Sequence, residues 1–161
     1  MATVVWSESN LVGEIVHDNI ANANFGSNDS YEIVTSTYPI VGGTNSFGKY
    51  LRVKFTGVFT TISNMLFWKL SGAYGVGELV KASGNATYAT PSQTGTGDST
   101  VPITEGTALA VNSAEGAATI INGGSGVSGY TGYIRLQLQT TGSTPSGAVA
   151  QKVFCLQFDE V

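Results

Sequence analysis

The sequence predicts an all-β protein: an antiparallel β-sandwich, jelly-roll-like, of about 8–10 strands with Gly-rich turns. Short runs of β-branched and aromatic residues recur along the chain at intervals of roughly 8–12 residues. Turns rich in glycine separate these runs, and the chain contains 21 glycines. Several runs also alternate apolar and polar side chains with period two, which is typical of strands with one dry and one wet face.

The alternation is clearest in residues 132–140, "GYIRLQLQT". Three aliphatic side chains fall on one face of this run, and Arg135 and Gln137 fall on the other. Residues 49–59, "KYLRVKFTGVF", and 152–158, "KVFCLQF", show the same period. We expect the apolar face of each strand in the core and the polar face in solvent.

Other runs complete the expected sandwich. They are residues 3–6, 31–41, 64–70, 78–81, 86–89, 100–103, 108–112 and 117–122. Residues 64–70, "NMLFWKL", are apolar almost throughout, and Pro39 places the run 31–41 at a sheet edge or caps it. Residues 10–25 are the one candidate for a short helix, although Gly13 and the asparagines weaken it.

The length of 161 residues fits a single domain, residues 1–161. No repeat of fixed period indicates a propeller or a solenoid. No Pro/Ser-rich linker divides the chain, and residues 91–99, "PSQTGTGDS", are expected to form an exposed loop.

The charge pattern argues against several classes of partner. Charged residues make up 11% of the chain, against roughly 25% in ordinary globular domains. The net charge is −4, and the densest basic group is only Lys49, Arg52 and Lys54, so we expect no nucleic-acid binding. Neither a signal-peptide pattern nor a run of 18 apolar residues is present, so we expect no membrane segment. The single cysteine, Cys155, fits synthesis in a reducing cytoplasm or a fold that does not depend on oxidation.

Catalytic chemistry finds little support in the residue inventory. His17 is the only histidine, and neighbours such as His17 and Asp18 in an irregular segment usually point to different sides. Cys155 lies in the middle of an expected strand, where a structural, half-buried thiol is the simpler interpretation. We therefore expect a protein that is not an enzyme and has no catalytic residue.

Cofactor and metal motifs are equally weak. Residues 124–129, "GSGVSG", match the dinucleotide pattern G-x-G-x-x-G, but a strand pattern follows where that motif needs a helix. Residues 22–30, "NANFGSNDS", have oxygen-bearing side chains but too few carboxylates for a good calcium site. The eleven acidic residues fall mostly in expected turns. We expect no cofactor and no metal.

Six aromatic residues near strand ends or turns are candidates for an interface: Trp6, Phe25, Tyr38, Phe47, Tyr74 and Tyr88. Aromatic side chains at such positions can contact sugars or partner proteins. The alternative is that these rings plug the ends of the sandwich.

Several stretches resemble small phage structural proteins, in particular head decoration (cement) proteins of the jelly-roll type. These stretches are "NMLFWKLSG" (64–72), "ATYATPS" (86–92), "VPI" (101–103), "GYIRLQLQTT" (132–141) and "CLQFDEV" (155–161). The resemblance covers residues 48–161 and rests on strand and turn patterns.

The resemblance implies a protein made in the host cytoplasm that binds the outside of the assembled capsid and stabilises it, often as a trimer. Its partners would be the major capsid protein and further copies of itself, and it would carry no catalytic residues. Many such proteins have an extended N-terminal arm that lies on the capsid. Residues 1–30 are the candidate for that arm, although residues 3–6 could equally be a strand of the sandwich.

Two alternatives stay open at this point. One is another virion component, such as a tail, baseplate or fibre-associated module. The other is a carbohydrate-binding β-sandwich in which Trp6, Tyr74 or Tyr88 stacks on sugar rings. A hydrolase fits poorly, because the chain has few residues suited to catalysis, with one histidine and one cysteine.

Overall fold

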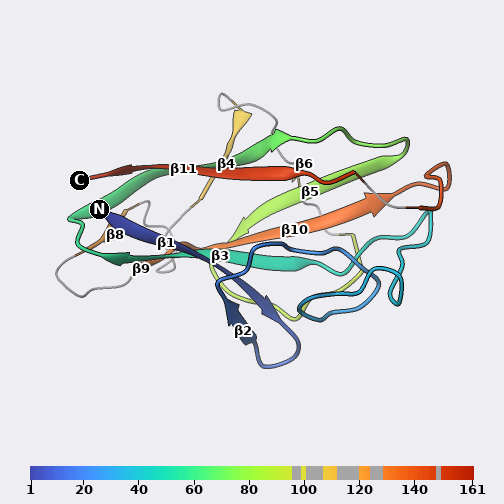
Figure 1. Cartoon of the computed structure of the whole chain (residues 1–161), viewed down its shortest axis with the longest axis horizontal. Helices are drawn as coiled ribbons and strands as arrows, with labels where there is room; N and C mark the ends of the chain where they lie inside the picture. Colours follow the sequence, from blue (N-terminus) through green and yellow to red (C-terminus); the bar gives the residue numbers. More distant parts are fainter. Residues whose placement is uncertain (96–98, 101–106, 112–119, 124–128, 148–149) are drawn as a thin grey trace.

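Backbone hydrogen bonds join the strands of this chain into two antiparallel sheets (Figure 1). The computed structural model describes residues 1–95, 99–100, 107–111, 120–123, 129–147 and 150–161. Within these ranges the strands are β1 (Ala2–Asn10), β2 (Ile15–Asp18), β3 (Lys49–Gly57), β4 (Thr61–Ser71), β5 (Glu78–Asn85), β6 (Ser99–Thr100), β7 (Leu109–Ala110), β8 (Ile121–Asn122), β9 (Gly129–Tyr130), β10 (Tyr133–Thr140) and β11 (Val153–Glu160).

The two sheets differ in size. Sheet A has the strand order β2-β1-β3-β10-β5-β6, with β9 paired to β3. Sheet B has the order β11-β4-β7, with β8 paired to β4. The all-β, antiparallel sandwich class is thus confirmed, whereas these pairings do not confirm a jelly-roll strand order. No helix long and apolar enough to cross a membrane occurs among the described residues.

The core lies between the sheets, where the period-two pattern places it. The side chains of Leu51, Val53 and Phe55 on β3 are 6%, 0% and 0% exposed, as the alternation in residues 49–59 predicts. The matching face of β11 packs against this core, and the ring centroids of Phe55 and Phe158 lie 4.9 Å apart in an edge-to-face arrangement.

The expected wet face of β10 is dry, so that part of the prediction is wrong. Gln137 is fully buried. Its Nε2 donates to the carbonyl oxygen of Ser46 at 3.0 Å and to the carbonyl oxygens of two residues in the 91–95 loop. Arg135 is only 4% exposed, and a Cβ atom added at Gly48 would lie 2.9 Å from its Nε. The loops before β3 and after β5 therefore cover the outer face of sheet A here, and hydrogen bonds compensate the buried polar groups.

The strand expected over residues 31–41 is absent. Two amides, those of Thr37 and Tyr38, donate to the carbonyl oxygen of Val34 at 2.9 and 3.0 Å, so the backbone closes local turns. Glu32 has a positive φ of 52°, an uncommon conformation for a residue other than glycine, and it interrupts the extended backbone. Because the hydrogen bonds are satisfied locally, β-branched composition alone does not make a strand here.

Two further expectations are also corrected. Residues 86–89 form no strand, and the Tyr88 hydroxyl donates to the carbonyl oxygen of Leu11 at 2.7 Å. Residues 10–25 contain no helix: a turn at residues 11–14 leads into β2. The run expected at residues 3–6 is part of a longer strand, β1, which pairs with β3 from Ala2 to Ser9. A capsid-binding role for residues 1–30 stays a prediction.

Some expectations fall partly outside the described residues. Of the runs 100–103, 108–112 and 117–122, only the parts in or next to β6, β7 and β8 are described. The same holds for residues 96–98 of the expected loop 91–99 and for 124–128 of the glycine-rich motif.

A group of tyrosine rings lies on the outer face of sheet A. The centroids of Tyr50 and Tyr88 are 5.1 Å apart, and that of Tyr133 lies 5.9 Å from the first and 6.0 Å from the second. The Tyr133 hydroxyl donates to the carboxylate of Glu14. Burial, and secondly this hydrogen bond, raise the pKa of Tyr133 from 10.0 to about 12.

We expect the free energy of unfolding to fall as the pH rises from 10 toward 12. In this window the unfolded chain releases the Tyr133 proton while the folded chain retains it, so proton release favours unfolding. Below pH 10 this contribution to stability is fully present. Urea unfolding across this pH window should show a shallower fall of the free energy of unfolding for the Tyr133→Phe variant than for the unmodified protein. Tyr38→Phe is the control, because Tyr38 is 39% exposed. Equal slopes for the Tyr133→Phe variant and the unmodified protein would contradict this assignment.

Candidate functional site

A cleft of about 990 Å³ opens between the two sheets, and the long loop of residues 19–48 forms one of its walls. This loop joins β2 to β3 and folds back on itself beside the sandwich (Figure 1). Inward-facing side chains of β3, β5 and β10 also line the cleft, as does the start of β11. Loops this long without secondary structure are uncommon in compact domains and are usually functional or disordered.

Five aromatic rings lie among the aliphatic side chains that line the cleft in the described part of the chain. The centroid of Phe67, which is fully buried, lies 6.3 Å from that of Trp6 on β1. Phe154 on β11 stacks against Phe67 at 5.6 Å, with an interplanar angle of 17°. Phe25 and Tyr38 come from the long loop, and Tyr38 is 39% exposed. The cleft therefore presents flat apolar faces contributed by both sheets and by the loop.

A few polar groups accompany these rings. Glu78 and Lys152 form an ion pair whose side chains are only 4% and 6% exposed. The other carboxylate oxygen of Glu78 accepts a hydrogen bond from the Gly75 amide at 2.9 Å. The amides of Asn22 and Gln151 add neutral donors and acceptors. A concave site with apolar walls and a few placed polar groups is the usual form of a ligand-binding site.

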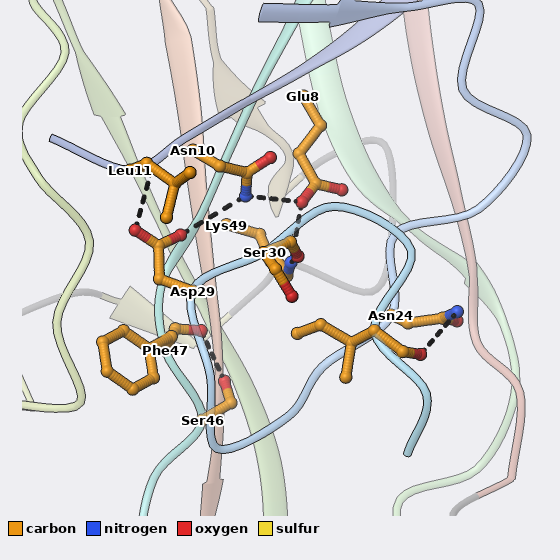
Figure 2. Close-up of polar contacts among 10 residues, drawn as sticks. Glu8, Asn10, Leu11, Asn24, Asp29, Ser30, Ser46, Phe47 and Lys49 are labelled. Atoms are coloured by element: carbon orange, nitrogen blue, oxygen red, sulfur yellow. Dashed lines mark hydrogen bonds and ion pairs between the residues drawn. The ribbon is translucent and has the colours of Figure 1, made fainter. Parts of the chain in front are cut away.

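A buried polar network fixes the loop to the sheet through Asp29 and Ser30 (Figure 2). Lys49 Nζ donates to Glu8 Oε1 at 2.7 Å, and both side chains are 1% exposed. The same ammonium donates to the carbonyl oxygen of Ser30, in the loop, at 2.8 Å. One buried cation thus joins β1, β3 and the loop.

Asp29 provides the second attachment of the loop. Its Oδ2 accepts a hydrogen bond from the Leu11 amide at 2.9 Å, and its Oδ1 accepts one from Asn10 Nδ2 at 3.4 Å (Figure 2). The same Nδ2 donates to Glu8 Oε1 at 2.8 Å. This network positions the loop that carries two of the cleft aromatics. Residues 7–10, "SESN", gave no sign of this burial, because the run is polar at every position.

Three of the six aromatic residues expected at an interface line the cleft: Trp6, Phe25 and Tyr38. Their separation in the sequence means that only the fold brings them together.

The other three aromatics lie elsewhere. Tyr74 is next to the cleft, and its ring centroid lies 5.6 Å from Lys152 Nζ. Phe47 is half-buried in the loop, where its amide donates to the carbonyl oxygen of Gly26 at 3.0 Å. Tyr88 belongs to the tyrosine group on the outer face of sheet A.

The residues considered for catalysis or metal binding have other surroundings. His17 lies on β2 and stacks on Tyr31 at 4.3 Å between ring centroids. Cys155 is a free, partly buried thiol on β11. In the segment 22–30, Asn24 Nδ2 donates to the carbonyl oxygen of Ile33 at 3.4 Å. Among the described residues, no three of His, Cys, Asp and Glu gather closely enough to hold a metal ion.

A second apolar surface lies on the outer face of sheet B. Because successive side chains of a strand point to opposite faces, Leu66, Trp68 and Leu70 of β4 face away from the core that Phe67 enters. Leu70 is 61% exposed, whereas Trp68 is only 9% exposed and Leu66 is partly buried. We call this surface, formed by Leu66, Trp68, Leu70 and Cys155, the outer face of sheet B. The mostly apolar run of residues 64–70, interrupted only by Asn64 at its start and by Lys69, was its signal in the sequence.

Comparisons of this chain with protein-family models, with curated proteins and with solved structures found no match. A functional interpretation therefore depends on the chemistry of the cleft and of the exposed faces.

Proposed function

We propose that this protein is a virion surface component, a decoration protein that binds the outside of an assembled phage capsid and stabilises it. The observation that supports this proposal best is the apolar outer face of sheet B. A strand that is apolar on both faces is typical of strands buried on both sides. In β4 one face packs in the core, whereas Leu70 on the other face is 61% exposed. A second molecule would complete its burial.

We propose that the outer face of sheet B is buried by contacts between subunits in a symmetric homotrimer. Interfaces between identical subunits are richer in apolar residues than the remaining surface, and tryptophan is enriched in them. Leu70, which is 61% exposed, would then lie at the centre of the contact, beside Leu66 and Trp68, of which Trp68 is already only 9% exposed in the single chain. The trimer would bind the major capsid protein, and binding only to the assembled shell would stabilise that shell by linkage.

Co-sedimentation with expanded shells of the same virion, assembled without this protein, tests the proposal. We expect saturable binding and a higher temperature of shell disruption when the protein is bound. Copy number per particle separates decoration from a tail, baseplate or fibre role, since decoration requires many copies. Absence of binding to shells would contradict the proposal.

A carbohydrate-binding β-sandwich is the second candidate, and the cleft is the observation that favours it. Trp6 and Tyr38 offer ring faces on which a sugar can stack, and the amides of Asn22 and Gln151 offer hydrogen bonds to hydroxyls.

On this second hypothesis, Tyr38→Ala should weaken glycan binding by about tenfold, because it removes one stacking ring. Tyr31→Ala, which removes the ring stacked on His17 outside the cleft, is the matched control. A glycan array followed by calorimetry on the best ligand provides the measurement. Failure to bind any glycan, or equal effects of the two variants, would exclude this function for the cleft.

A further inference from the structure

Two neighbouring cations lie over tyrosine rings on the outer face of sheet A. Arg52 Cζ is 4.4 Å from the ring centroid of Tyr130 and 5.0 Å from that of Tyr133. Lys54 Nζ is 5.4 Å from the centroid of Tyr130. Arg52 and Lys54 are two residues apart on β3, so their side chains share one face of the sheet.

Neither cation forms an ion pair with a carboxylate of the described residues. Arg52 Nε is buried and has no hydrogen-bond partner in that part of the chain. Asp18 lies in the same row of the sheet, since Ser7 of β1 is the register partner of both Asp18 and Arg52. Its carboxylate accepts a hydrogen bond from the Ser7 hydroxyl at 2.5 Å.

Stacking leaves the edge of a guanidinium free. A guanidinium over an aromatic face still presents its N–H donors in the ring plane, and this fork matches the two oxygens of a carboxylate. An ammonium on the same face adds a second positive charge. A hydrogen bond with the Tyr130 side chain, and to a smaller extent the charge of Asp18, raise the pKa of Lys54. The chain has only seven basic residues and a net charge of −4, so two adjacent cations that form no ion pair with a carboxylate of the described residues stand out.

We propose that Arg52 and Lys54, with Tyr130 beside them, form a docking site for an acidic segment of a partner protein. A carboxylate of that segment would accept hydrogen bonds from the Arg52 guanidinium and lie close to the Lys54 ammonium. Charge complementarity supports this occupant, because two partly exposed cations share one face of β3. The inference rests on the proposed function only in taking the partner to be a protein.

Titration of the full-length protein with an oligoglutamate peptide, followed by NMR or calorimetry, tests this site without any capsid. We expect oligoglutamate to bind, and its binding to weaken with added salt. An oligoglutamine peptide of the same length, which carries no charge, is the control and should not bind. The Arg52→Gln/Lys54→Gln variant should lose about tenfold in affinity, because charge-assisted hydrogen bonds are removed. Lys81→Gln on β5 of the same sheet is the control and should bind unchanged.

Two measurements keep the test decisive. Urea unfolding of the double variant checks that this variant still folds. If the double variant does not fold, the single variant Lys54→Gln takes its place in the titration. Equal affinity of the substituted and unmodified proteins, or no binding of oligoglutamate, would overturn the proposal. Binding of a sialylated oligosaccharide in place of the peptide would also overturn it, by assigning the site to a sugar carboxylate. A failure to bind shells leaves the peptide titration unaffected, so the two proposals fail separately.

Discussion

Replacing Lys49 by methionine should lower the free energy of unfolding by about 3–5 kcal/mol, because it leaves a carboxylate buried without its cation. Lys49 is fully buried, and its ammonium lies 2.7 Å from Glu8 Oε1. In the variant, Glu8 keeps one hydrogen bond, from Asn10, in place of a full charge partner. Methionine retains much of the apolar stem, so the lost charge accounts for most of the effect.

The same substitution should also loosen the wall of the cleft. Lys49 Nζ donates to the carbonyl oxygen of Ser30, and without that bond the loop of residues 19–48 loses one of its attachments. Hydrogen exchange in this loop should therefore rise more than in β10.

Urea unfolding measures the stability effect, and a second variant separates charge from packing. Glu8→Gln/Lys49→Met removes both charges and should recover part of the loss, since no unpaired charge remains. Lys81→Met on the same sheet is only partly buried and should change stability by less than about 0.5 kcal/mol. A loss below about 1 kcal/mol for Lys49→Met, or no recovery in the double variant, would show that this ion pair does not hold the structure together.

The long strands were predictable because their inward faces follow a period of two. β3 and β11 show this directly, since their alternating apolar residues enter the core as expected. Residues 31–41 illustrate the limit of the same reasoning. Their β-branched composition favours a strand, yet Glu32 has a positive φ and the amides close local turns. Propensity cannot reveal whether a neighbouring strand is available to pair with a segment.

The burial of polar side chains was harder to predict from the sequence than the strands. The polar run of residues 7–10 lay outside the strand expected over residues 3–6, although all four of its side chains are buried in β1. Their partners lie far along the chain: Glu8 meets Lys49, and Asn10 meets Asp29. Contacts over such separations leave no local pattern, so neither this network nor the cleft that it supports was visible in the sequence. The single trace was that three of the aromatics expected at loop or strand ends line the cleft.

Leu70→Glu should convert the proposed trimer into monomers. Leu70→Glu places a charge on the apolar outer face of sheet B, where burial in a contact would cost several kcal/mol per subunit. The expected effect on the fold is small, since Leu70 is 61% exposed in the single chain. Val12→Glu, at an 82% exposed position on the β1–β2 turn, introduces the same charge away from this face and is the matched control.

Light scattering coupled to size-exclusion chromatography tests most directly whether the outer face of sheet B joins subunits. We expect a trimer for the unmodified protein and for Val12→Glu, and a folded monomer for Leu70→Glu. A monomeric unmodified protein at every concentration tested, or a trimer that survives Leu70→Glu, would contradict the account.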